Sequence, residues 1–118
     1  MKIVDIRTTF LYQPFETAIS DAARSIPGRD VLIVEVITDL DIIGQGFVTG
    51  LSIAHGSEIP VIDAIITKGL KPMILGKDVL TIERLWQVMY EGTTRFGRKG
   101  AAVRAISGVD IGVVQVWI

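Results

Sequence analysis

The chain has 118 residues, a formal net charge of −1 and no cysteine. This length suits one domain with its own core, and the lack of cysteine excludes disulfides and thiolate metal sites. The balanced charge gives no general attraction to nucleic acid, and no run of 18 apolar residues is present to cross a membrane. Because Asp5 and Arg7 interrupt the first apolar stretch, we expect no signal peptide and a cytoplasmic location.

Three antiparallel strands are predicted in the first half of the chain. Side chains alternate between apolar and polar in the first strand, the middle strand is apolar on both faces apart from Glu35, and the third returns after the turn at Asp39-Leu40-Asp41. Pro14 is expected to end the first strand. Gly44 and Gly46 in the third indicate either a bulge or a place where another group comes close. The predicted strands cover residues 1–12, 31–38 and 42–48.

Two stretches beside these strands lack a regular pattern. Residues 15–29 are mixed in polarity and close with the turn signal Pro27-Gly28, and residues 49–56 are rich in small residues. We expect both to be irregular loops. Long loops in compact domains are commonly functional.

Three helices are predicted in the second half. The first starts near Ser57 and stops near Gly69, which precedes a Lys-Pro pair. The second has its N-cap at Asp78 or Thr81. Apolar residues at steps of three and four favour a helix at the end of the chain, although its β-branched residues leave a buried strand as an alternative. The expected core residues are Ile82, Leu85, Trp86 and Met89 in the second helix, and Ala102, Ile106, Val109, Val113 and Val116 in the last.

The order of three strands followed by three helices indicates an α+β fold, an antiparallel three-stranded meander with helices on one face, in a single domain of residues 1–118. Hydrophobic residues make up 49% of the chain even before its 12 glycines are added. This is more than most small domains contain, which indicates that some apolar surface is covered by another domain or another copy.

Residue patterns alone predict no active site. The single histidine, His55, lies in a glycine-flanked loop with no evident partner network. No carboxylate spacing fits a metal-binding loop. Basic residues around the start of the last helix are able to hold an anion, but a solvated helix entry is the simpler interpretation. These basic residues are Arg95, Arg98, Lys99 and Arg104.

Several segments carry a resemblance to a known family. ILGKD, IERLW and AISGVDI occur in this order, after an opening MKIVDIR and a hairpin VEVITDLDIIGQGF. With these segments the whole chain resembles the N-terminal capping domain of the mandelate racemase and muconate lactonizing enzyme group of the enolase superfamily. The resemblance implies that a (β/α) barrel follows, and that this barrel carries the catalytic residues and the ligands of Mg²⁺. We therefore expect the 118-residue chain to be inactive alone and to hold no cofactor itself.

In such enzymes the capping domain closes the barrel over a small carboxylate or sugar-acid substrate. Racemisation, cycloisomerisation or dehydration then begins with proton abstraction next to the carboxylate. The capping loops would match residues 18–29 and the segment after Gly46, and the sugar-acid dehydratases are the more similar members. The substrate-contacting candidates are Ile19, Ser20, Asp21, Arg24 and Phe47.

The last residues depart from the family, which usually has a Trp-Asp pair where this chain has Val114-Gln115. Two alternatives therefore stay open. One is a stand-alone interaction domain that forms oligomers through its apolar face without catalysis. The other is an anion-binding module built on the basic cluster, with salt-dependent binding. The expected partner is the barrel domain or a second copy of the chain, most simply in a homo-oligomer.

Overall fold

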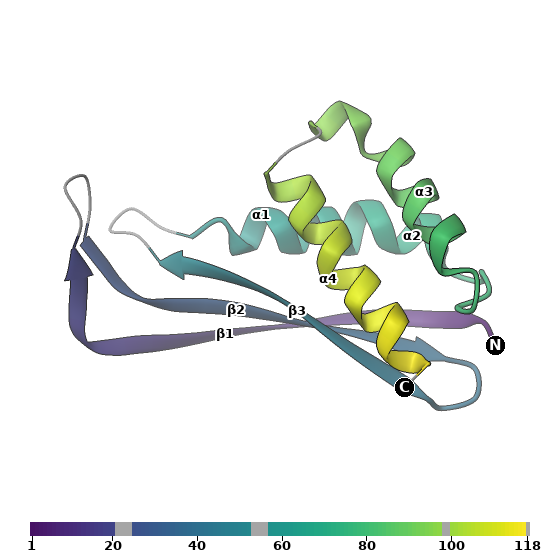
Figure 1. Ribbon diagram of the computed structural model, residues 1–118, viewed down its shortest axis with the longest axis horizontal. Coiled ribbons are helices and arrows are strands. Elements are labelled where there is room, and N and C mark those ends of the chain that lie inside the picture. Colours follow the sequence, from purple (N-terminus) through teal and green to yellow (C-terminus); the bar gives the residue numbers. More distant parts are fainter. Residues whose placement is uncertain (21–24, 53–56, 98–99, 118) are drawn as a thin grey trace.

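The computed structural model describes residues 1–20, 25–52, 57–97 and 100–117. Its three antiparallel strands form one sheet in the order β1-β2-β3, and the helices cover one face of that sheet (Figure 1). The predicted α+β class is confirmed. The strands are β1 (Ile3–Ser20), β2 (Ser25–Thr38) and β3 (Ile43–Ser52); the helical elements are α1 (Ile59–Ala64), the π-helix η1 (Ile65–Leu70), α2 (Lys71–Ile74), α3 (Ile82–Gly92), the 3₁₀-helix η2 (Thr94–Phe96) and α4 (Ala101–Val116).

The first two strands are longer than the sequence pattern indicated. In the described part of residues 15–29, the expected loop is wrong, because the pairs Ile19–Ile26 and Ser20–Ser25 continue the hairpin. The predicted end at Pro14 is also wrong. β1 is an edge strand, where proline is tolerated, and a register shift between Pro14 and Ile19 absorbs it. The expected loop at residues 49–56 is also predicted to begin too early, because β3 continues to Ser52.

β2 is the central strand and divides the sheet into two faces. Its even-numbered side chains from Asp30 to Thr38 are buried toward the helices, while the odd-numbered ones from Val31 to Ile37 are half-buried on the opposite, open face. This alternation explains why the middle strand looked apolar on both sides. The core therefore lies between the helix-facing side of the sheet and the helices.

The first helical run extends beyond its predicted end. α1, η1 and α2 follow one another without a break from Ile59 to Ile74, so the predicted stop at Gly69 is wrong. Proline has no N–H to donate, and the wide π-helical turn just before α2 lets the helix continue past Pro72. At the start, the Ile59 N–H donates to Ser57 Oγ at 3.1 Å, although Glu58 occupies the N-cap position.

The two later helices agree with their patterns except at one residue. In α3, Leu85 and Met89 are buried, but Trp86 is 40% exposed and stacks on Tyr90 with ring centroids 4.9 Å apart. Its assignment to the core is therefore wrong. The predicted apolar stripe of α4 is buried along its whole length, from Ala102 to Val116. The strand alternative for this segment is wrong.

Candidate functional site

Both stretches expected to contain the capping loops begin and end at the same end of the sheet. The outer end of the β1–β2 hairpin, the end of β3 and the start of α1 lie together there (Figure 1). Pairing of Gly28 with Ser52 fixes the end of β3 against the start of β2. The fold thus gives the two segments a common, sheet-based support.

The predicted contact residues do not form one cluster. Ile19 and Ser20 lie in the hairpin opposite Ile26 and Ser25, whereas Phe47 lies opposite Ile33 in the middle of the sheet. Ile26 and Ile33 are seven positions apart along β2, or about 23 Å of strand at 3.3 Å per residue. Asp21, Arg24 and His55, together with Arg98 and Lys99 of the basic cluster, lie outside the described residues.

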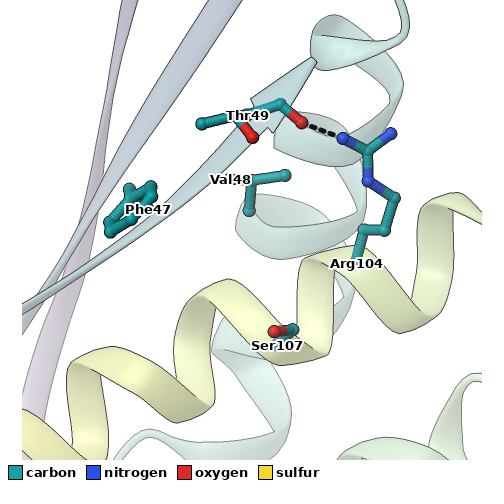
Figure 2. A pocket seen from close by; sticks show the side chains of 5 residues that line it. All are labelled: Phe47, Val48, Thr49, Arg104 and Ser107. Atoms are coloured by element: carbon teal, nitrogen blue, oxygen red, sulfur yellow. Dashed lines mark hydrogen bonds between the residues drawn. The ribbon is translucent and has the colours of Figure 1, made fainter.

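A cavity of about 190 Å³ opens beside β3 where α4 crosses it (Figure 2). Phe47 borders the cavity and is 57% exposed, whereas the neighbouring Val48 is buried against the helices. The lining residues are Phe47, Val48, Thr49, Arg104 and Ser107.

Arg104 makes the polar contacts of this region. Its guanidinium donates a hydrogen bond to the Thr49 carbonyl and forms an ion pair with the Glu58 carboxylate. From the sequence, Arg104 is one of the basic residues able to hold an anion, with a solvated helix entry as the simpler interpretation; in the fold its charge is engaged by Glu58. Glu58 was missed as a partner, although an acidic residue at a helix start is a signal that was available; a backbone carbonyl such as that of Thr49 leaves no signal at all.

Four glycines set the position of α4. A side chain at Gly44 would overlap the carbonyl oxygen of Gly112, and one at Gly46 would overlap that of Gly108. β3 pairs with β2 without any register shift, so these strand glycines mark a close approach and not a bulge. α4 therefore packs directly on the backbone of β3.

The described residues do not fit a magnesium site. Within these parts of the chain, no three His, Asp or Glu side chains gather to hold a metal ion.

Two carboxyl groups have shifted pKa values. The pKa of Asp5 is held below its usual value, first by the hydrogen bond from Lys71 Nζ at 2.7 Å. Burial raises the pKa of Asp110 on α4. Among the described helices none is long and apolar enough to cross a membrane.

Comparison with known proteins gives a consistent set of relatives. The chain is 39% identical over 111 residues to arabinonate dehydratase of Saccharolobus solfataricus, which covers 92% of this chain and 29% of the relative. A racemase from Streptomyces coelicolor A3(2), solved with bound magnesium, is 28% identical with a TM-score of 0.82, over 94% of this chain and 30% of its own. The chain thus spans about 30% of the length of these relatives.

A third relative has a ligand in its structure. L-talarate dehydratase from Polaromonas sp. JS666, complexed with Mg and L-glucarate, is 27% identical with a TM-score of 0.77, over 95% of this chain and 30% of its own. The family described as "Mandelate racemase / muconate lactonizing enzyme, N-terminal domain" matches residues 3–116. Sequence and fold together show that the chain belongs to this family of N-terminal domains in the enolase superfamily.

Proposed function

We propose that the chain is the substrate-capping domain of a larger, Mg²⁺-dependent enzyme that acts on a small carboxylate or sugar acid. Its family membership and its share of about 30% of each relative's length support this. The observation that carries the proposal is that the outer end of the β1–β2 hairpin, the end of β3 and the start of α1 lie at one end of the sheet. Loops on a rigid scaffold are well placed to close over a substrate.

In this function the cap excludes water and contacts the part of the substrate away from the reacting carbon. The groups that would remove the proton next to the carboxylate, and the ligands that would hold Mg²⁺, lie outside this chain; the metal would supply Lewis-acid stabilisation of the negative charge that develops on the substrate. We assign the first substrate contacts to the hairpin residues Ser20, Asp21 and Arg24, beside Ile19, because their side chains suit hydroxyl and carboxylate groups. Phe47 lies about 23 Å away, measured along the strand, so we assign it a separate role as part of the wall of the substrate site.

The outward face of α4 supports a large covering partner. Ile111, Val114 and the C-cap residue Trp117 follow one another at steps of three, off the buried stripe, and are 41%, 37% and 56% exposed. We propose that the barrel of the longer enzyme covers this face. The same observation favours the second candidate function, an oligomerising interaction domain in which another copy covers it.

The intact mass of the polypeptide made by its source organism distinguishes the two. For the capping function we expect a mass above 12.9 kDa by about one barrel of 250 residues. That polypeptide is then assayed with a panel of aldonic and aldaric acids, with EDTA and after restoring Mg²⁺. We expect turnover that EDTA abolishes and Mg²⁺ restores, and none with the 118-residue chain. A native mass of 12.9 kDa would contradict the capping function.

A further inference from the structure

Asp110 is the charged residue of α4 for which the described part of the chain supplies no ion pair. The helix has two charged side chains, and the other one, Arg104, pairs with Glu58. Among the described residues, no cation lies within ion-pair distance of the Asp110 carboxylate. The residue is half-buried, and this burial raises the pKa of its carboxyl group. A desolvated carboxylate without a partner costs free energy, which indicates that a contact outside this chain offsets it.

The side chain of Asp110 belongs to the outer face of α4. It lies four residues before Val114 and seven before Trp117, so the three share one row on the helix surface. Val114 and Trp117 are exposed, and Ile111 extends the apolar patch along the helix. A partner that covers this patch therefore also removes Asp110 from water.

Two observations favour the barrel of the longer enzyme as that partner. The chain belongs to a family of N-terminal domains, and it spans about 30% of the length of its relatives. The family match ends at residue 116, where α4 also ends, so the remainder of such a polypeptide follows this helix directly. A second copy fits less well, because a two-fold contact places the same patch on both sides and brings like charges together.

We propose that Asp110 is the polar contact of this interface and that the barrel presents a cationic side chain to it. The inference rests on the proposed function, in which the barrel covers the outer face of α4. A cation replaces the water that the carboxylate loses, and the apolar side chains around the pair exclude solvent from it. A purely apolar barrel surface would instead leave a buried, unpaired charge, which is strongly unfavourable.

The test compares Asp110→Asn in the 118-residue chain and in the longer polypeptide, by backbone amide hydrogen exchange along α4. In the 118-residue chain the change removes an unpaired charge, so we expect exchange up to about threefold slower at residues 110–114. In the longer polypeptide it leaves a buried cation without its partner, so exchange at the same amides should be about tenfold faster. Asp110→Glu keeps the charge and should fall between Asp110→Asn and the unaltered polypeptide.

Glu83→Gln is the matched control, because Glu83 is an exposed carboxylate on the neighbouring helix α3. We expect it to leave exchange along α4 unchanged in both forms. If α4 is better protected in the longer polypeptide but Asp110→Asn does not accelerate its exchange there, the cationic partner is overturned and the barrel contact is kept. Equal protection of α4 in the two forms would overturn the barrel contact as well. A native mass of 12.9 kDa would overturn the proposed function on which both depend.

Discussion

Asp5 shows how one side chain links two elements of the fold. It accepts a hydrogen bond from the Ile6 N–H at 2.8 Å, one from Arg7 Nε at 3.3 Å, and the ion pair from Lys71 Nζ at 2.7 Å. Since β1 carries Asp5 and α2 begins with Lys71, the pair ties the edge of the sheet to the first helical run. The ionised carboxylate is thereby favoured in the folded state, which lowers its pKa.

The lowered pKa predicts a pH dependence with a definite sign. The unfolded chain binds the proton of Asp5 more readily, so the stabilisation is present above the usual aspartate pKa and is lost as the pH falls through the folded-state value. Asp5→Asn should therefore reduce the free energy of unfolding at pH 7 by up to about 1 kcal/mol, the range for partly exposed ion pairs. The difference should shrink as the pH is lowered from 7 through the usual aspartate range to pH 2. Urea unfolding at both pH values measures it.

Lys71→Gln should reproduce this loss at pH 7, and Lys68→Gln, in the preceding π-helical turn, should not, because no ion pair of Lys68 is present among the described residues. An Asp5→Asn effect that is equal at both pH values would show that the backbone contact to Ile6, and not the charge, is responsible.

The close contact between α4 and β3 requires glycine at the positions where the two backbones meet. The strand glycines meet helix carbonyls, and on the helix a Cβ at Gly108 would lie 2.5 Å from Val48 Cγ2. Gly46→Ala should therefore push the helix from the sheet and lower the free energy of unfolding by about 3 kcal/mol, the upper range for overpacking. Gly50→Ala is the control in the same strand, because its nearest neighbour would be 3.7 Å away. Chemical denaturation compares the free energies of unfolding of the two variants. Equal small losses of stability would mean that α4 can shift away from β3 without a loss of stability.

Most elements were predictable because each has a local signature. Strand patterns predicted the three strands, and apolar residues at steps of three and four predicted α4. Gly44 and Gly46 correctly indicated a place where another element approaches β3 closely. The outer hairpin was missed because residues 15–20 show no alternation, and strand pairing there depends on register with β2. The helical run through Pro72 was missed because a π turn has no sequence signal strong enough to outweigh Gly69 and a proline.

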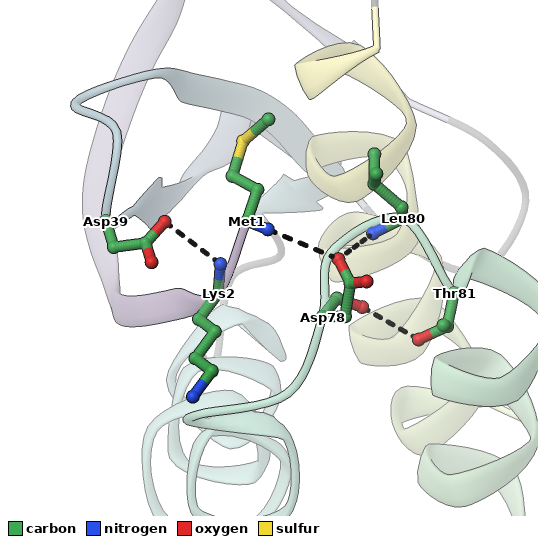
Figure 3. Close-up of polar contacts among 6 residues, drawn as sticks. All are labelled: Met1, Lys2, Asp39, Asp78, Leu80 and Thr81. Atoms are coloured by element: carbon green, nitrogen blue, oxygen red, sulfur yellow. Dashed lines mark hydrogen bonds and ion pairs between the residues drawn. The ribbon is translucent and has the colours of Figure 1, made fainter.

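The N-terminus and two connecting segments are tied together by contacts that no sequence pattern predicted. Figure 3 shows the Met1 amino group paired with Asp78 at 3.7 Å and the Lys2 N–H donating to Asp39 Oδ1 at 3.0 Å. Asp78 also accepts from the Leu80 N–H at 3.0 Å, which fixes the link before α3. The start of β1, the β2–β3 turn and this link thus meet at the end of the sheet opposite the loop-bearing end (Figure 1). The candidate site was less predictable for the same reason, since Thr49, Glu58 and Arg104 come from three separate elements.

At the scale of the whole molecule, the excess of apolar residues is divided between the core and an uncovered helix face. The core uses the inner stripe of α4, and Ile111, Val114 and Trp117 stay on its outer side. Burial of an apolar side chain stabilises an association by about 1.5–3 kcal/mol when complete, so this face favours contact with a partner. In the 118-residue chain the available partner is a second copy.

We therefore predict that the isolated chain self-associates at high micromolar concentration through the outer face of α4. The double variant Ile111→Ser/Trp117→Ser should shift the association constant by at least about tenfold, because roughly 1.4 kcal/mol of apolar burial is lost. Phe96→Ser serves as the control, since Phe96 is as exposed as Trp117 but lies on η2. Sedimentation equilibrium gives both constants, and urea unfolding confirms that the variants keep their stability. If the chain is monomeric throughout, or if Phe96→Ser has the larger effect, the outer face of α4 does not drive association, and a barrel at this face would have to bind through other contacts.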